Sequence, residues 1–172
     1  METLLSCAKF KVVSRDVRTR DGRTVRRAVI EHPGAVVILP LLDDGRIVLV
    51  RVFRHTLERE LLELPAGTLD RPGEPPRDAA WRELAEETGY RADHLREIGA
   101  LYPSPGVMTE LIRAYLATGL HSAPAALEET EQIEVECVEP DQALAWIDNG
   151  EISDAKTALT LLRWDRAGRP SR

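Results

Sequence analysis

The stretch from Glu74 to Tyr90 reads Glu-Pro-Pro-Arg-Asp-Ala-Ala-Trp-Arg-Glu-Leu-Ala-Glu-Glu-Thr-Gly-Tyr. It predicts a helix that begins at Pro76 and ends before Gly89, because proline favours the first helical position and glycine favours the residue after the last. Positions i, i+3 and i+4 of such a helix lie on one face. Three carboxylates occupy these positions: Glu83, Glu86 and Glu87.

The charge on this helix face indicates what it binds. Like charges at this spacing repel each other, and Arg82 is the one arginine next to them in the sequence. A stable helix that keeps such a face indicates a strongly positive partner, and hard divalent cations with oxygen ligands fit best. The ordinary alternative is a solvated acidic face, which is what an isolated group of glutamates usually forms.

The order of residues around these glutamates resembles a known signature. The chain has Glu74, then seven residues, then Arg82-Glu83-Leu84-Ala85-Glu86-Glu87-Thr88-Gly89-Tyr90. This is similar to the signature of the Nudix hydrolases, which cleave nucleoside diphosphates linked to a further group. That signature begins with a glycine, here Gly67, and six residues separate it from Glu74, one more than the pattern. The additional residue falls in the turn-rich stretch 68–73, where the chain absorbs an insertion easily.

Composition limits the classes of protein to which the chain can belong. Its 172 residues are 43% hydrophobic and 30% charged, which suits one compact α/β or α+β domain. A net charge of -6 argues against tight binding to a nucleic-acid backbone. Cys7 and Cys137 are too few for a disulfide scaffold and point to reduced thiols in the cytoplasm. Residues 1–11 lack the apolar run of a signal peptide, and no stretch approaches a membrane span, so no membrane partner is expected.

Turn residues divide the first part of the chain into strands. Residues 10–17 and 24–31 alternate around an Asp-Gly turn and predict an N-terminal hairpin. Residues 35–42 and 46–53 predict a second hairpin, whose strands are rich in Val, Ile and Leu and are therefore expected to be buried on both faces. Further strands are expected at residues 57–64, 95–101, 111–117 and 133–138.

Two helices are expected near the end of the chain. The first covers residues 141–148 and is stopped by Asn149-Gly150, and the second covers residues 154–164 and is capped by Ser153. We therefore divide the chain into an N-terminal hairpin and dimerisation region (1–33), a Nudix hydrolase domain (34–166) and a tail that is expected to be disordered (167–172).

Flanking residues extend the resemblance beyond the signature. They are Glu60-Leu61-Leu62-Glu63-Leu64-Pro65-Ala66-Gly67 and Arg51-Val52-Phe53-Arg54 before the helix, and Pro103-Ser104-Pro105-Gly106 after it. They look like the ADP-ribose pyrophosphatase branch of the family, so the similarity covers most of residues 10–165. It implies an α/β fold, the Nudix-type α/β/α sandwich with a mixed central sheet, preceded by the N-terminal antiparallel hairpin.

The resemblance also implies a metal site built mainly from the helix. A diphosphate is already anionic, so its hydrolysis needs a deprotonated water and neutralised phosphoryl oxygens, and Mg²⁺, or Mn²⁺ as a substitute, supplies both. By resemblance Glu83 and Glu87 bridge the ions, Glu86 completes their coordination, and the backbone carbonyl of Ala66 adds a ligand. Arg82 is expected to orient the glutamates, and its alternative role is a surface ion pair with Glu86.

The general base is expected on an acidic loop before the strand at 133–138. Resemblance to the branch indicates a glutamate there, with Glu131 as the first choice and Glu129 as the second. An acidic loop without a catalytic role is the alternative. Glu74 is expected to have a structural role or to support the metal ligands rather than to bind metal itself.

Five residues are expected to contact the substrate. By position, Arg51 and Arg54 follow a buried strand, and Arg54 is expected to grip a phosphate through its planar guanidinium, with an ordinary surface arginine as the alternative. Glu63 is expected to accept a hydrogen bond from a ribose or a base. The resemblance suggests that Pro105 and Gly106 shape a loop over the distal ribose, and their alternative role is a simple tight turn.

The resemblance implies one main function. The chain is expected to hydrolyse ADP-ribose or a related nucleoside diphosphate sugar, with Mg²⁺, to AMP and a sugar phosphate. Relatives often have Gln where Val52 stands, so a GDP-sugar, another dinucleotide or a damaged nucleotide stays open as substrate. A nucleotide sensor without hydrolytic activity and an interaction domain with an acidic helix stay open as well. The basic ribbon at Lys9–Arg27 needs a surface to pack against, so a homodimer is expected, with a monomer as the alternative.

Overall fold

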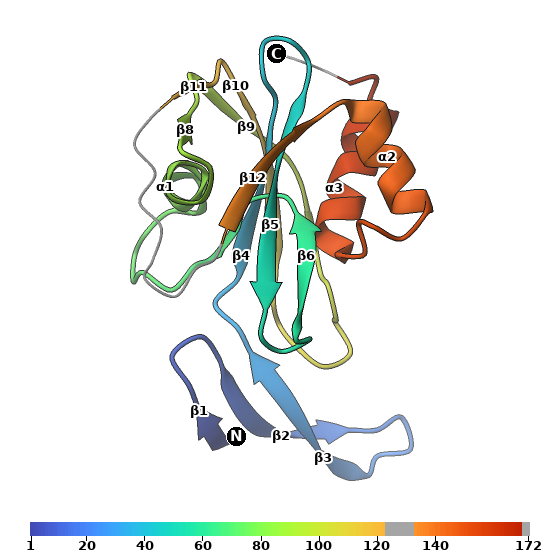
Figure 1. The fold of residues 1–172 in the computed structure, drawn as a ribbon. Helices are drawn as coiled ribbons and strands as arrows, with labels where there is room; N and C mark the ends of the chain where they lie inside the picture. The colour runs from blue at the N-terminus through green and yellow to red at the C-terminus, as the bar shows by residue number, and fades with distance from the viewer. Residues whose placement is uncertain (123–132, 170–172) are drawn as a thin grey trace.

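Two sheets form the centre of the molecule, with helices on both sides. The structure, a computed structural model, describes residues 1–122 and 133–169. Helix α1 (Pro76–Thr88) covers one side of the sheets, and α2 (Pro140–Asp148) and α3 (Ala155–Arg166) cover the other (Figure 1). This arrangement confirms the expected α/β/α fold. Within the described residues, no helix has the length and apolar character needed to cross a membrane.

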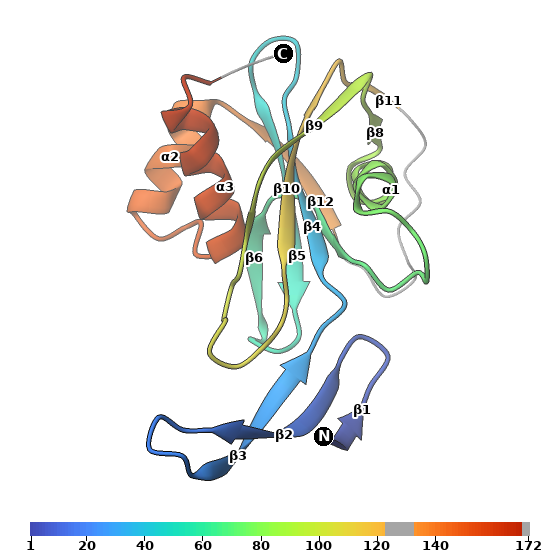
Figure 2. The same ribbon diagram turned by 180° about the vertical axis from the view of Figure 1, so that it is seen from behind.

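The larger sheet is mixed, as expected. Its strands have the order β7-β4-β10-β9. Strands β4 (Ala35–Pro40) and β10 (Ile112–Thr118) run parallel, whereas β7 (Ala66–Thr68) and β9 (His94–Leu101) are antiparallel to their neighbours. Seen from behind, β10 and β9 lie along the face of the molecule in front of β4 (Figure 2).

Strand β4 is buried on both faces, which confirms that prediction. Val37 and Leu39 lie in a hydrophobic cluster with side chains of α2 and α3, whereas Val36 and Ile38 lie in a second cluster with side chains of α1. The alternation follows from the period of two along a strand. Each helical layer is therefore anchored to the same central strand.

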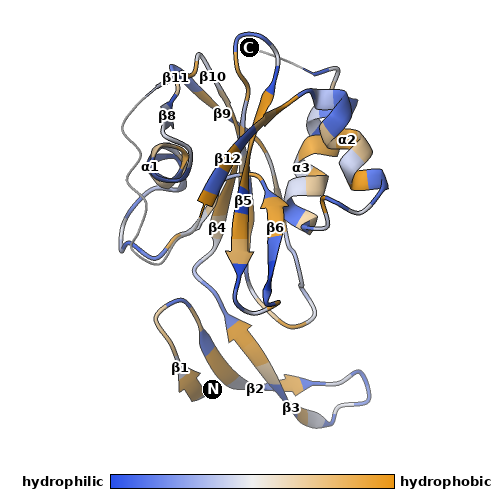
Figure 3. Cartoon of the chain, viewed as in Figure 1, coloured by the Kyte–Doolittle hydropathy of each residue, from blue (hydrophilic) through white to orange (hydrophobic). Residues whose placement is uncertain are grey.

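Strand β5 (Ile47–Arg54) belongs to a different sheet from β4. It pairs with β6 (Arg59–Glu63) and β12 (Ile133–Val138), both antiparallel, in the order β12-β5-β6. The predicted second hairpin is therefore correct only at its turn. Leu41 and Ile47 form an antiparallel bridge and the Leu42 N–H donates to the Arg46 carbonyl at 2.9 Å, but β4 and β5 do not pair along their length. Strand β4 already has β7 and β10 on its two edges, so no edge remains for β5. Both strands are strongly hydrophobic (Figure 3), and this pattern does not reveal which neighbour pairs with a buried strand.

The N-terminal residues form a separate antiparallel sheet at one end of the molecule (Figure 1). The expected hairpin is present as β2 (Lys11–Arg18) and β3 (Thr24–Glu31), and β1 (Glu2–Ser6) adds a third strand that the sequence pattern did not predict. The sheet is tied to the loop before β10, because the Ile30 N–H donates to the Val107 carbonyl and the Thr109 N–H donates to the Ile30 carbonyl, both at 2.9 Å.

The helix ends follow the sequence closely, with one exception. Helix α1 ends as expected, at a glycine, Gly89, with a φ of 68°. The cap of α3 is Asp154 rather than Ser153, because the Asp154 carboxylate accepts the Thr157 N–H at 3.0 Å. Both residue types cap helices well, and the position at which the chain turns decides between them. Two short strands, β8 (Tyr90–Arg91) and β11 (His121–Ser122), pair beside α1.

Candidate active site

A cavity of about 640 Å³ is lined both by α1 and by the first turn of α3. On the α1 side, the wall consists of strand β7 and the acidic face of α1. The residues are Ala66, Gly67 and Thr68 of β7, and Arg82, Glu83, Glu86 and Glu87 of α1. Other parts of the wall come from β5 and the start of α3: Val52, Arg54, Asp154, Ala155 and Lys156. The cavity thus joins segments that are far apart in the sequence.

Arg82 lies at the centre of the acidic wall. Its Nε and Nη2 donate to the two carboxylate oxygens of Glu74 at 3.1 and 3.0 Å. Its Nη1 donates to Glu83 and to Glu86, both at 2.7 Å. The hydrogen bonds to Glu74 raise the pKa of Arg82, and the same contact lowers the pKa of Glu74 below its ordinary value. One arginine therefore offsets the repulsion between neighbouring carboxylates.

The backbone before α1 lies directly against the acidic face. The Ala66 N–H donates to Oε2 of Glu87 at 2.9 Å. At the next residue, a Cβ added to Gly67 would lie 2.0 Å from the carboxylate carbon of Glu83, which is closer than any real contact. Glycine at 67 therefore provides the space in which the Glu83 carboxylate sits.

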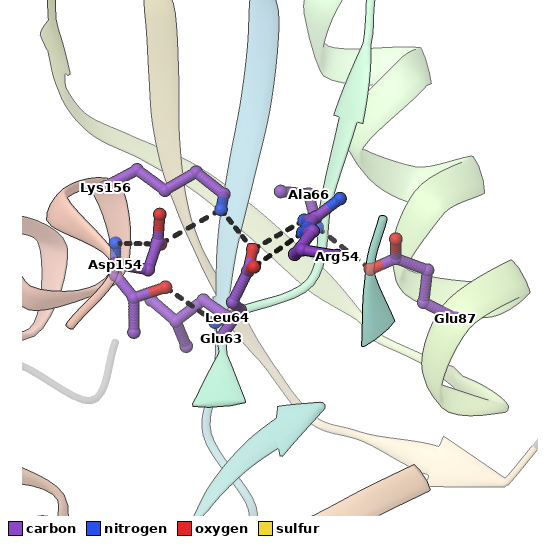
Figure 4. Close-up of polar contacts among 8 residues, drawn as sticks. Arg54, Glu63, Leu64, Ala66, Glu87, Asp154 and Lys156 are labelled. Atoms are coloured by element: carbon purple, nitrogen blue, oxygen red, sulfur yellow. Dashed lines mark hydrogen bonds and ion pairs between the residues drawn. The ribbon is translucent and has the colours of Figure 1, made fainter. Parts of the chain in front are cut away.

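A buried carboxylate holds two cations on the other side of the cavity. Glu63 is 1% exposed and accepts Nε and Nη2 of Arg54 at 2.7 and 2.6 Å. Lys156 also donates to Glu63, and it donates to Asp154 at 2.9 Å. Figure 4 shows Arg54 and Lys156 meeting at the Glu63 carboxylate, with Ala66 and Glu87 on the side toward α1. The hydrogen bond with Glu63 raises the pKa of Arg54.

The family model described as "NUDIX domain" matches residues 31–160, well over half of the chain. The chain belongs to the Nudix family. An ADP-ribose pyrophosphatase of Bacillus subtilis (strain 168) is 40% identical over 162 residues, which cover 93% of this chain and 87% of that protein. An ADP-ribose pyrophosphatase of Mycobacterium tuberculosis (strain ATCC 25618 / H37Rv) is 42% identical over 145 residues, covering 84% and 67%. The solved structure described as "Crystal structure of ADP compounds hydrolase" aligns with a TM-score of 0.82 and 25% identity, covering 99% of this chain and 94% of that one.

Membership in the Nudix family confirms the predicted resemblance and makes the chain a hydrolase. Nudix hydrolases generally need divalent metal ions. The donor set of this Nudix chain fits such ions in kind, because glutamate carboxylates and a backbone carbonyl are hard oxygen ligands. Among the described residues, no three His, Cys, Asp or Glu side chains already converge as a metal site. Arg82 and the Ala66 N–H hold the carboxylates instead, so a metal ion would share the glutamates with Arg82.

The two arginines expected to contact substrate lie in different places on this Nudix fold. Arg54 lines the cavity, as does Val52, but Arg51 is not among the lining residues. Arg51 donates from Nε to Glu136 at 2.8 Å, and its Nη1 lies 3.6 Å from Glu151. The separation follows from the strand period, because residues 52 and 54 share a face of β5 and residue 51 has the opposite one.

The other predicted site residues are placed as follows. Glu63 is near the cavity but is covered by the two cations that it holds. Pro105 and Gly106 are exposed on the loop before β10, where Pro103 lines the cavity. The two candidate bases, Glu129 and Glu131, lie outside the described residues. The catalytic roles of Glu129 and Glu131 and the substrate-binding roles of Glu63, Pro105 and Gly106 stay predictions.

Sequence reasoning did not predict that Lys156 and Asp154 line the cavity. Asp154 was predicted only as the start of a helix. Lys156 contacts Glu63 across 93 residues, so no local periodicity indicates the contact. Composition was the one feature of the sequence that singled out Lys156, because the chain has three lysines and Lys156 alone lies outside the N-terminal region.

Proposed function

We propose that this Nudix hydrolase cleaves the pyrophosphate bond of ADP-ribose or of a related nucleoside diphosphate sugar, giving AMP, or another nucleoside monophosphate, and a sugar phosphate. The observation that carries this proposal is the two-sided cavity, with carboxylates of α1 on one wall and Arg54 and Lys156 on another. A diphosphate needs both, because cations must neutralise its oxygens on every side as the bond breaks. The names of the two relatives support the same class of substrate.

The proposed roles follow the positions of the side chains. Glu83, Glu86 and Glu87, with the Ala66 carbonyl, would hold Mg²⁺, with Mn²⁺ as a substitute. Bound there, the metal supplies Lewis acidity and a more acidic water. Arg82 keeps the carboxylates on one face. Arg54 would bind a phosphate through the guanidinium edge that Glu63 does not occupy.

Further roles are proposed on the resemblance alone. The general base would be Glu131, or Glu129 in its place. Arg51, Pro105 and Gly106 keep their proposed roles as substrate contacts, although Arg51 already has ionic partners in the fold. A direct bond from Glu63 to the substrate would require its carboxylate to give up Arg54 or Lys156.

One experiment tests the main proposal. Nucleoside diphosphate derivatives are incubated with Mg²⁺ and the products are separated by ion exchange, for the wild type, for Glu87→Gln and for Glu97→Gln. Glu87→Gln is expected to lower ADP-ribose turnover by roughly 10²-fold or more, the scale seen when a group that stabilises transition-state charge is lost. Glu97 pairs with Arg113 outside the cavity, so Glu97→Gln is expected to keep full turnover. Wild-type turnover in Glu87→Gln would refute the metal assignment.

A second substrate class has a specific observation in its favour. Val52 lines the cavity, so the residue that departs from many relatives lies where the substrate would bind. A GDP-sugar, another dinucleotide or a damaged nucleotide is therefore the alternative substrate. The same panel decides between them by relative kcat/KM. Binding of one compound without any cleavage would favour the nucleotide sensor instead.

We also propose a homodimer formed through residues 1–33, located in the cytoplasm. Leu4, Leu5 and Val17 are exposed by 55%, 52% and 44% on the N-terminal sheet, which is more apolar surface than an isolated ribbon favours. Cys7 and Cys137 are free thiols, which supports a reducing compartment. Size exclusion with light scattering tests the dimer, and a single species of 19.2 kDa would refute it.

A further inference from the structure

The buried Glu63 carboxylate has an unusual arrangement of partners. Its side chain is 2% exposed and does not line the cavity, whereas Arg54 and Lys156, which it binds, both do. The negative charge is therefore placed behind the two positive charges. Because a buried carboxylate is costly unless fully paired, Arg54 and Lys156 are held tightly to it. Seen from the cavity, Arg54 and Lys156 lie in front of the Glu63 carboxylate, and Asp154, which accepts from Lys156, lines the cavity beside them.

Both cations keep hydrogen-bond capacity for a ligand. An ammonium has three N–H donors and a guanidinium has five. Within the described part of the chain, Lys156 uses two donors, on Glu63 and on Asp154, and Arg54 uses two, both on Glu63. The Lys156 side chain is 14% exposed and lines the cavity, so its third N–H is available to a ligand bound in the cavity. An anion with several oxygens is the ligand that suits such a pair.

The position of Lys156 is fixed by the backbone as well as by charge. In the first turn of α3, Oγ1 of Thr157 accepts the Leu64 N–H at 2.8 Å, and both residues are buried. This bond and the contact between Lys156 and Glu63 tie α3 to the end of β6. Two residues after Leu64, the Ala66 N–H donates to Glu87 of α1. The segment 63–66 therefore sets the distance between the cations and the acidic helix.

We propose that Lys156 is a substrate-binding residue that, together with Arg54, holds the diphosphate from the side opposite the α1 carboxylates, and that Glu63 is the positioning residue that fixes both cations. This inference rests on the proposed function, since it assigns an anionic substrate to the cavity. It gives Glu63 a role behind the substrate in place of a direct bond to a ribose.

Two physical effects predict opposite results for Glu63→Gln. The substitution makes the cavity more positive by one charge, so Coulomb attraction alone predicts tighter binding of a diphosphate. If Glu63 positions the cations, its loss lets both side chains move, and binding weakens despite the added positive charge. The direction of the change thus separates positioning from simple charge.

The test measures the Kd of the non-hydrolysable α,β-methylene analogue of ADP-ribose by calorimetry, and KM and kcat for ADP-ribose, in the wild type and four variants. Lys156→Gln is expected to weaken binding roughly ten- to hundred-fold and to raise KM similarly, the loss associated with one charged hydrogen bond. Lys156→Arg, which keeps the charge, is expected to recover most of the affinity. Glu63→Gln is expected to weaken binding. The control is Arg163→Gln, on α3 but outside the cavity, where Arg163 donates to the Ala100 carbonyl at 2.9 Å.

Binding and cleavage by the wild type test the proposed function, whereas the Kd and KM of the variants relative to the wild type test the roles of Lys156 and Glu63. A wild type that neither binds the analogue nor cleaves ADP-ribose refutes the proposed function. A wild type that does both, with Lys156→Gln within about twofold of it in Kd and KM, overturns the role of Lys156, since about 0.4 kcal/mol is less than one hydrogen bond. Tighter binding by Glu63→Gln overturns the positioning role.

A measurement on the wild type covers the case in which Lys156→Gln does not fold. Acetylation of lysines is followed by mass spectrometry with and without the analogue. The chain has three lysines, Lys9, Lys11 and Lys156, and Lys11 is exposed on β2 outside the large cavity, so it serves as the internal reference. The analogue is expected to slow acetylation of Lys156 severalfold relative to Lys11. Equal rates with and without the analogue would overturn the proposal.

Discussion

The Glu83 carboxylate occupies the space that a side chain at Gly67 would fill, since a Cβ there would lie 2.0 Å from its carboxylate carbon and from Oε1. The φ of Gly67 does not require glycine, so contact with Glu83 is what selects it. This relationship links the glycine that begins the signature to the first glutamate of the acidic face. It also allows a direct test.

Gly67→Ala is expected to displace Glu83 and to destabilise the fold by about 1–3 kcal/mol, the usual cost of adding a methyl group to a filled site. Hydrolytic activity is expected to fall with it. Chemical denaturation of Gly67→Ala, Glu83→Ala and the double variant gives the coupling between the two sites. In the Glu83→Ala background, Gly67→Ala is expected to change the free energy of unfolding little, because the carboxylate that it displaces is absent. An undiminished cost there would show that Glu83 is not the cause.

Arg82→Gln is expected to destabilise the protein by up to about 3 kcal/mol, because carboxylates on one helix face lose the cation they share. Added Mg²⁺ is expected to recover more of the melting temperature in this variant than in the wild type, since the ion replaces the missing charge. The control is Arg71→Gln, because Arg71 is exposed and touches only Glu86 among the described carboxylates, at 3.5 Å. Equal recovery by Mg²⁺ in wild type and Arg82→Gln would contradict this account.

Two threonines of α3 provide a matched pair for stability. Both are fully buried, and Oγ1 of Thr157 accepts the Leu64 N–H, whereas Oγ1 of Thr160 has no partner among the described residues. Thr157→Val is expected to cost about 1–3 kcal/mol because a buried N–H loses its acceptor. Thr160→Val is expected to be neutral or stabilising. Urea denaturation of both variants checks this, and similar losses would show that the hydrogen bond to Leu64 contributes little.

Asp154 is expected to make stability depend on pH in the acid range. Burial raises the pKa of Asp154, but Lys156 and the hydrogen bonds from Thr157 and Lys156 outweigh burial, so its pKa lies below the ordinary 3.8. A carboxyl with a lowered pKa stabilises the folded state above its unfolded pKa, and this contribution is lost as the pH falls through the folded pKa. The wild type is therefore expected to have a higher free energy of unfolding than Asp154→Asn. This difference is expected to be constant from about pH 7 to about pH 5 and to become smaller below pH 3.8.

Denaturation of both proteins at a series of pH values measures that difference. A gap that stays constant below pH 3.8, or that widens there, would show that the charge of Asp154 does not stabilise the fold.

Particular elements show where sequence reasoning succeeded and where it failed. The bounds of α1 were predicted correctly because its first proline and final glycine are local signals. The pairing of β4 was not, because a run of buried aliphatic residues has the same appearance beside any neighbour. Arg51 and Arg54 were grouped as one pair although strand alternation places them on different faces. Glu129 and Glu131 lie outside the described residues and stay predictions.

By itself the sequence determined the acidic helix, its glutamate spacing and the family to which the chain belongs, because all three depend on residues within one short segment. Only the tertiary structure decided which side chains face that helix. Glu63 and Lys156 are 93 residues apart, and their contact exists because α3 packs on the sheet with its first turn at the end of β6. Local periodicity reports that a face is buried, but a distant segment covers it, and long-range packing selects that segment.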